Sequence, residues 1–142
     1  MAFTTSFWPA TDDQPLVNLT VGDSLRKAAA AVPTKIALIE GTPDPASRAR
    51  LTYEQLLAES ERMARALLGS FKPGDHIAVW APNSADWIVL QYGLALAGMV
   101  LVTVNPAYRE SELEYVLKQS RARGIFFSPA HRGTDMRAIV NA

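Results

Sequence analysis

The fold is decided by residues 77–104, which read IAVWAPNSADWIVLQYGLALAGMVLVTV. The stretch opens with the apolar run Ile77-Ala78-Val79-Trp80 and closes with the β-branched run Val100-Leu101-Val102-Thr103-Val104. Both runs are typical of buried strands. Between them, Asn83-Ser84 can cap a helix over residues 85–97, which is apolar nearly all round and therefore buried on most sides. The stretch predicts a strand, a buried helix and a second strand.

An alternative for the same region is a membrane span, because residues 87–104 are nearly all apolar and long enough to raise the question. Gln91, Gly93 and Gly98 interrupt the run, and its β-branched end is typical of a strand, so a buried helix and strand are favoured. Residues 1–18 contain no basic residue and no long apolar run, so no secretory signal is visible. We therefore expect a cytoplasmic chain without a transmembrane segment.

Upstream, the sequence predicts two more helices and a short strand. The first helix starts near Thr20 and is stopped by Pro33. Residues 36–39 are predicted to form a short buried strand, and a turn-rich loop follows at 41–48. The residues before Thr20 are predicted to be irregular.

The helix predicted over residues 52–71 has the clearest start signal. Thr52 and Gln55 have the spacing of a capping box, and Leu51 can pack on Leu56 as a hydrophobic staple. One broad face is predicted to point inward, and its apolar members are Tyr53, Leu56, Leu57, Met63, Ala64, Leu67, Leu68 and Phe71. The opposite face carries Glu54, Glu59, Arg62 and Arg65.

Downstream, a helix is predicted to start at Ser111, which has capping-box spacing to Glu114. Residues 125–127 are predicted to form a further strand, and residues 132–142 to be the start of a last helix. Strands and helices therefore alternate from Ile77 onward, and the strands are continuously apolar. This pattern predicts an α/β fold: a mostly parallel sheet with helices on both faces and right-handed crossovers.

Composition excludes several kinds of function. The 142 residues include 14 Lys and Arg and 14 Asp and Glu, which gives a formal charge of zero and no electrostatic footprint for nucleic acid. No cysteine is present, so a disulfide scaffold, a thiolate metal site and a thiol nucleophile are excluded.

Two short motifs resemble chemical sites but lack the supporting residues. Ser24 and Lys27 have the serine-x-x-lysine spacing of penicillin-binding enzymes, without their companion motifs. Gly69 and Gly74 have the glycine spacing of a phosphate loop, but Asp75 stands where that loop needs lysine. Structural roles at helix ends and turns are the favoured interpretation for both.

The remaining polar and aromatic candidates also have simpler structural explanations. His76 and His131 are far apart in sequence, and neither has a carboxylate at ligand spacing. Three aromatic residues could line a pocket but are more typical of core packing, namely Trp80, Trp87 and Tyr92. The acidic group Glu110, Glu112 and Glu114 suits a solvated first helical turn. We therefore assign no catalytic, cofactor-binding or metal-binding residue from local patterns.

Four segments, in matching order and spacing, resemble the N-terminal part of the adenylate-forming (AMP-binding) acyl-CoA synthetases. They are residues 51–56 (LTYEQL), 74–87 (GDHIAVWAPNSADW), 97–108 (AGMVLVTVNPAY) and 112–118 (ELEYVLK). The run Val104-Asn105-Pro106-Ala107-Tyr108 is most similar to the fatty acyl-CoA ligase branch, including the medium-chain type. Two positions depart from the usual pattern, His76 for arginine and Arg109 for threonine, and both are predicted to be exposed.

The resemblance implies a fold, a reaction and a set of ligands. It implies the N-terminal part of the family's large domain, with 1–19 as an irregular segment and 20–142 as a partial subdomain. The full-length enzyme would use ATP, Mg²⁺ and coenzyme A: a fatty acid attacks ATP to give an acyl-adenylate, and the coenzyme A thiol then displaces AMP. The family's phosphate loop and catalytic lysine lie downstream, so this chain alone, about the first quarter, is expected to be an inactive scaffold.

Two alternatives remain open at this stage. The chain could be a free-standing α/β binding or interaction module without enzymatic activity, or a short enzyme with an unrecognised site. Because its apolar strands need cover on both faces, the isolated chain is also expected to self-associate.

Overall fold

The structure, a computed structural model, describes Pro9 and residues 16–141. Residues 16–19 form no helix or strand, and most of the segment predicted to be irregular, 1–19, lies outside the described residues. The elements in chain order are α1 (Val21–Ala31), β1 (Ile36–Ile39), the 3-10 turn η1 (Pro45–Ser47), β2 (Arg50–Thr52), α2 (Tyr53–Leu68), β3 (His76–Trp80), α3 (Ala85–Leu96), β4 (Val100–Val104), α4 (Glu110–Ser120), β5 (Gly124–Phe127), β6 (Ala130–His131), β7 (Thr134–Asp135) and α5 (Met136–Val140).

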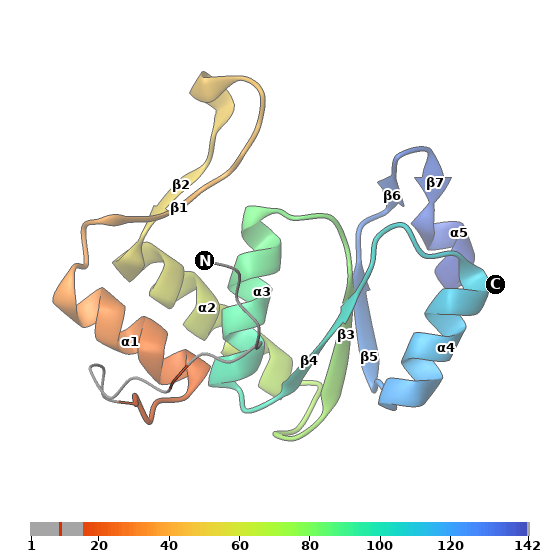
Figure 1. Cartoon of the computed structure of the whole chain (residues 1–142), viewed down its shortest axis with the longest axis horizontal. Coiled ribbons are helices and arrows are strands. Elements are labelled where there is room, and N and C mark those ends of the chain that lie inside the picture. The colour runs from red at the N-terminus through yellow and green to blue at the C-terminus, as the bar shows by residue number, and fades with distance from the viewer. Residues whose placement is uncertain (1–8, 10–15, 142) are drawn as a thin grey trace.

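A three-stranded parallel sheet lies at the centre, in the order β4-β3-β5. Successive side chains of a strand point to opposite faces, and β3 shows this clearly. Ile77 and Val79 join one core cluster with residues of α2 and α3, whereas Ala78 and Trp80 join a second cluster with residues of α4 and α5. Figure 1 shows the sheet between these two helical layers, and the predicted α/β class is confirmed.

The predicted helix signals explain most element boundaries. The Thr20 hydroxyl accepts a hydrogen bond from Asp23 N, and the Ser84 hydroxyl accepts one from Trp87 N. Thr52 and Gln55 form the full capping box of α2. Gly98, with φ of +69°, follows α3 in a left-handed conformation that few other residues adopt without strain.

Helices α2 and α3 approach closely at Gly93. A Cβ atom there would lie 2.6 Å from the Met63 Cγ and 3.3 Å from the Ser60 carbonyl oxygen, so only glycine fits without displacement. Ser60 is fully buried at this contact, and its hydroxyl has no hydrogen-bond partner among the described residues. Ser60 lies on the inward face of α2, between Leu56 and Ala64 at i, i+4 spacing, but its polar side chain kept it out of the predicted core.

Four predictions are wrong in detail. Leu68, the last residue of α2, is 48% exposed, whereas Leu67 is buried and Phe71 packs against the same core cluster. The strand at 36–39 is not buried, since Ile36 and Ile39 are both exposed. Helix α4 begins at Glu110, and the Glu112 carboxylate, not Glu114, accepts the capping hydrogen bond, from Arg109 N. Residues 130–135 form the small hairpin β6–β7 before α5 begins.

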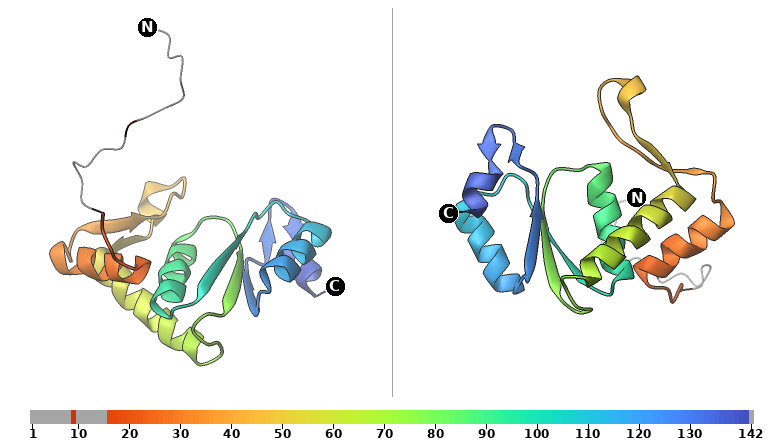
Figure 2. Two further views of the ribbon diagram at one scale, coloured as in Figure 1. Left: turned by 60° about the horizontal axis from the view of Figure 1, so that its bottom comes forward. Right: turned by 180° about the vertical axis from the view of Figure 1, so that it is seen from behind.

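The antiparallel pair β1–β2 projects from the helical layer that contains α1, α2 and α3 (Figures 1 and 2). At its base, the Glu40 carboxylate lies 3.5 Å from Ala85 N, at the N-terminus of α3. Among the described residues, no helix is both long enough and apolar enough to cross a membrane.

Candidate functional site

The topology points to the carboxyl ends of β3 and β5 as the candidate site. The chain passes from β3 to β4 on one side and then returns across β3 to β5 on the other. In open α/β sheets, ligands bind outside the carboxyl ends of the strands at such a switch point. Three loops meet at this edge: 81–84 after β3, 105–109 after β4 and 128–129 after β5.

Several polar groups of these loops take part in local structure. The Ser84 hydroxyl caps α3, and the Asn105 side-chain oxygen accepts from Ala107 N at 3.0 Å. The Asn105 carbonyl oxygen accepts from the indole nitrogen of Trp80, also at 3.0 Å. These contacts tie the ends of β3 and β4 together. They leave no nucleophile paired with a base.

A groove of about 390 Å³ opens beside the same edge. Its walls are mainly apolar, and the side chains that matter here are Met63, Trp87, Leu90 and Phe126, with Ser84 and Asp86 as polar members. Among the residues that the structure describes, no lysine, arginine or histidine lines it. A groove of this chemistry can accept apolar side chains, but it offers no cation to hold a phosphate or carboxylate.

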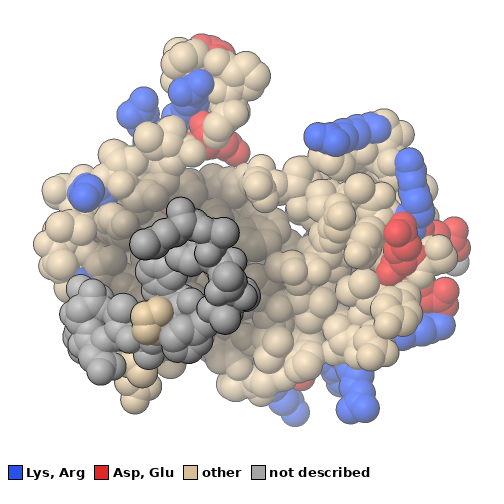
Figure 3. Space-filling model, viewed as in Figure 1, with Lys and Arg blue, Asp and Glu red and all other residues tan. Residues whose placement is uncertain are grey.

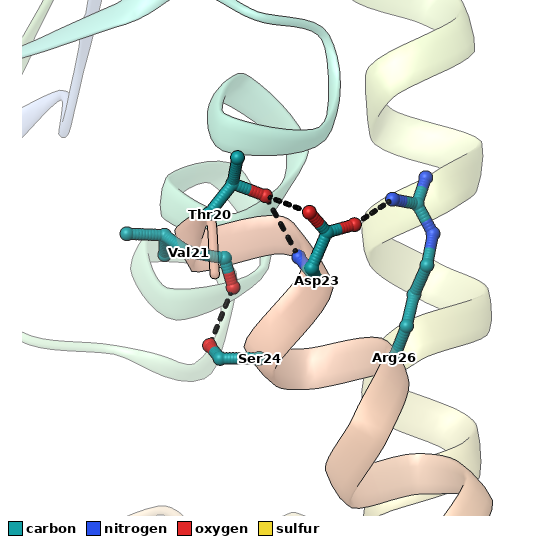
Figure 4. A network of polar contacts seen from close by, with 5 residues as sticks. All are labelled: Thr20, Val21, Asp23, Ser24 and Arg26. Atoms are coloured by element: carbon teal, nitrogen blue, oxygen red, sulfur yellow. Dashed lines mark hydrogen bonds and ion pairs between the residues drawn. The ribbon is translucent and has the colours of Figure 1, made fainter. Parts of the chain in front are cut away.

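Ser24 of the serine-x-x-lysine motif has a structural role, as Figure 4 shows. The Ser24 hydroxyl donates to the Val21 carbonyl oxygen of its own helix at 2.6 Å. The neighbouring Asp23 carboxylate accepts from the Thr20 hydroxyl at 2.7 Å and pairs with Arg26. The Thr20 hydroxyl is the main cause that holds the pKa of Asp23 below its usual value. This network stabilises the start of α1.

The two histidines lie in separate elements. His76 is half-buried rather than exposed, because its Nδ1 atom lies 2.7 Å from the Ser120 carbonyl oxygen at the end of α4. His131 lies in β6. Within residues 16–141 and at Pro9, no group of three His, Cys, Asp or Glu side chains could bind a metal ion. Arg109 is exposed as predicted, and its guanidinium donates to the Thr134 hydroxyl at 2.8 Å.

The aromatic candidates divide into core and groove residues. Trp80 is fully buried in the centre of the sheet, as core packing predicts. Tyr92 packs against the cluster of Leu25, Leu56 and Val89. Trp87 is half-buried and lines the groove. Sequence reasoning missed Phe126 as a groove residue, because an apolar strand gives no sign of which face remains uncovered.

The glycine loop and the acidic cluster also have structural roles. Gly69 follows the last turn of α2, and Lys72 N donates to the Asp75 carboxylate at 2.8 Å. Asp75 thus closes a turn at the position where a phosphate loop would need lysine. In the acidic cluster, Glu112 caps α4, and a hydrogen bond from Lys118 lowers the pKa of Glu114.

Comparison with known proteins identifies the family of this chain. A model of the family described as "AMP-binding enzyme" matches residues 25–141. The chain belongs to this AMP-binding enzyme family. Its fold agrees, because 87% of the chain superposes on 29% of the N-terminal domain of FACL13 from Mycobacterium tuberculosis, with a TM-score of 0.74 and 27% identity.

Two curated relatives of this AMP-binding chain are acyl-CoA-forming enzymes by name. The mitochondrial medium-chain acyl-CoA ligase ACSF2 of Rattus norvegicus is 42% identical over 116 residues, which cover 81% of this chain and 18% of the rat protein. YngI of Bacillus subtilis, provisionally named an acyl-CoA synthetase, is 37% identical over 128 residues, which cover 89% of this chain and 23% of YngI. The chain thus spans less than a quarter of either relative.

Proposed function

We propose that this chain is the scaffold that opens the large domain of a fatty acyl-CoA synthetase. The observation that supports it is a mismatch: the family match runs through 25–141, yet no phosphate-binding loop or catalytic pair lies among the described residues. The whole enzyme would join a fatty acid to coenzyme A in two steps. The carboxylate attacks ATP and releases pyrophosphate, and the coenzyme A thiol then displaces AMP from the acyl-adenylate.

The chain's own contribution to this reaction is positional. The caps and turns at the carboxyl ends of β3 and β4 fix the edge at which α/β enzymes bind their ligands. The described residues include no donor set for Mg²⁺ and no cationic group in the groove, so no catalytic step is assigned to them. ATP, Mg²⁺ and coenzyme A are proposed as ligands of the whole enzyme.

A medium-chain fatty acid is the proposed substrate, on the strength of the likeness to ACSF2. The test is pyrophosphate release by the protein encoded by the whole gene, with ATP, Mg²⁺ and fatty acids of graded length. Highest kcat/KM for medium-chain acids is expected. Release that is no faster with fatty acids than without them would overturn the proposal.

The isolated chain is proposed to be inactive, because no phosphate-binding loop lies among the described residues to stabilise phosphoryl charge in such reactions. Calorimetry with ATP and Mg²⁺ should show no binding at micromolar concentrations. Micromolar affinity would instead favour a free-standing binding module. The gene sequence after codon 142 distinguishes the synthetase segment from the free-standing module independently. Only the gene of a synthetase would continue into a phosphate loop.

A further inference from the structure

A pocket of about 350 Å³ lies at the amino end of the sheet, opposite the candidate site. It is lined by Ser70, Phe71, Lys72 and Asp75 from the segment before β3, and by Ala122 and Arg123 from the segment before β5. Two of these residues are cations, whereas the groove at the carboxyl end has none among the residues that the structure describes. The two ends of the sheet therefore differ in the ligands that they can attract.

The pairing of β3 with β5 holds the two walls of this pocket together. Ile77 and Gly124 are partners in the parallel register, and Arg123 N donates to the His76 carbonyl oxygen at 2.8 Å. The Phe71 ring packs directly on Gly124, where a Cβ atom would lie 2.6 Å from it. The two cations, which are far apart in sequence, are thus carried on one rigid frame.

The positive charge of the pocket is not neutralised within the described residues. Their three salt bridges involve neither Lys72 nor Arg123. Asp75 is the one carboxylate among the described lining residues, and it accepts a hydrogen bond from Lys72 N at 2.8 Å. Figure 3 shows basic side chains along the lower edge of the molecule, below the sheet. In a chain with a formal charge of zero, this local excess of positive charge attracts anions.

Arg121, next to the pocket wall at Ala122, has an unusual backbone conformation. It is the C-cap of α4, with φ of +54° in the left-handed region where glycine is the usual residue. Its side chain is exposed, so core packing does not require an arginine there. A strained backbone position that keeps a cation supports a role for charge at this end of the sheet.

The size and chemistry of the pocket select a class of ligand. Its volume of about 350 Å³ lies within the range of small-molecule sites, roughly 300–1,000 Å³. Lysine and arginine are the side chains that bind phosphate groups, and Ser70 adds a hydroxyl. Phe71 and Ala122 offer apolar surface to an organic group attached to the phosphate. A nucleic acid would need a longer basic surface than these two cations provide.

We propose that this pocket is a second ligand site, which binds the phosphate group of a phosphomonoester between Lys72 and Arg123. It lies at the end of the sheet opposite the edge at which α/β enzymes bind their substrates. The ligand is therefore distinct from the ATP and the fatty acid of the proposed synthetase. The site depends only on this chain, so it stands or falls separately from the proposed function.

The test is saturation-transfer NMR on the full 142-residue chain, with phenyl phosphate as the probe and benzyl alcohol as its uncharged control. This measurement observes the ligand and works for a monomer or an assembly. Phenyl phosphate should give a saturable signal with a dissociation constant of about 1 mM or lower. Inorganic phosphate should displace it, and benzyl alcohol should give no such signal.

Variants locate the bound phosphate. Lys72→Gln and Arg123→Gln should each weaken binding about tenfold, because each removes a charge-assisted hydrogen bond. Both residues are exposed, so the fold should persist, and circular dichroism checks it. Arg50→Gln is the matched control, since it removes the same charge from an exposed position on β2, outside the pocket. Its affinity should stay within about twofold of the original chain.

A vesicle assay distinguishes the two sources of such a phosphate group. Binding of phenyl phosphate without sedimentation on vesicles that contain phosphatidic acid assigns a free phosphomonoester. Sedimentation that requires Lys72 and Arg123 assigns a lipid headgroup.

Three outcomes would overturn the proposal: no saturable signal from phenyl phosphate, no loss with Lys72→Gln and Arg123→Gln, or an equal loss with Arg50→Gln. The last would mean that the chain attracts anions by its general charge and not at this pocket. Pyrophosphate release by the whole enzyme tests the proposed function, and neither result changes the reading of the other.

Discussion

Strands β3 and β5 are neighbours with similar apolar sequences, yet their environments differ. Residues 77–80 of β3 are all buried, whereas no residue of β5 is. The difference comes from position: β3 pairs on both sides and has helices on both faces, whereas β5 has one paired edge and one covered face. Burial in this sheet therefore depends on neighbouring elements more than on composition. Four comparisons between substitutions break or sharpen this conclusion.

The largest contrast is expected between Trp80 and Phe126. Trp80→Ala removes a fully buried side chain and its hydrogen bond to Asn105, and should cost about 3–5 kcal/mol of unfolding free energy. Phe126→Ala removes a side chain that is 37% exposed and should cost about 1 kcal/mol. Urea denaturation measures both. Similar costs would mean that β5 is covered in the isolated chain, for example by self-association, which light scattering would detect.

The same contrast should appear at the end of α2. Leu67 is 3% exposed, and Leu67→Ala should cost about 2–5 kcal/mol. Leu68→Ala, one residue later, should cost less than about 0.5 kcal/mol, and so should Arg62→Ala on the solvent side. Thermal melts of the three variants provide the comparison. A costly Leu68→Ala would show that this part of α2 packs against another surface in solution.

Gly124 tests whether β5 is anchored at its first residue. A Cβ atom there would lie 2.6 Å from the Phe71 ring, so Gly124→Ala should cost about 1–3 kcal/mol by overpacking. Gly41→Ala is the control, since nothing lies within 4 Å and the change should be neutral or slightly stabilising. Phe71→Leu should partly rescue the Gly124→Ala variant in chemical denaturation. If Phe71→Leu does not rescue Gly124→Ala, the contact with the Phe71 ring is not the cause of the destabilisation.

The smallest effect is expected at Ser60. Its buried hydroxyl has no hydrogen-bond partner within residues 16–141, so Ser60→Ala should stabilise the chain by about 1 kcal/mol or less. Ser84→Ala removes a helix cap and should destabilise by about 0.5–2 kcal/mol. The sign of the change in the midpoint of urea unfolding distinguishes them. Destabilisation by Ser60→Ala would indicate that the hydroxyl has a partner in solution.

Local sequence signals predicted where helices begin better than they predicted which residues pack against one another in the fold. The capping residues Thr20, Thr52 and Ser84 act within three residues of their partners, so their roles are visible in the sequence. The bond between His76 and Ser120 joins residues 44 positions apart. No local pattern contains that information.

The candidate site was less predictable than the fold. Its walls come from α2, α3 and β5, and each wall residue taken alone resembles an ordinary core residue. The family resemblance identified the framework and explained why its described residues lack a phosphate loop. It could not reveal that Phe126 stays uncovered, because exposure depends on which other parts of the domain are present.

The central position of β3 also affects how the chain emerges during synthesis. Both partners of β3 follow it in sequence, so an N-to-C growing chain carries an unpaired strand, apolar from Ile77 to Trp80, until β4 and then β5 are made. At roughly 5–20 residues per second, that interval lasts seconds, which is far longer than hydrophobic collapse. Helices α1 and α2 are complete before β3 appears, so one face of the strand can be shielded early. The other face must wait for α4, which makes it the side that ribosome-associated chaperones would need to protect.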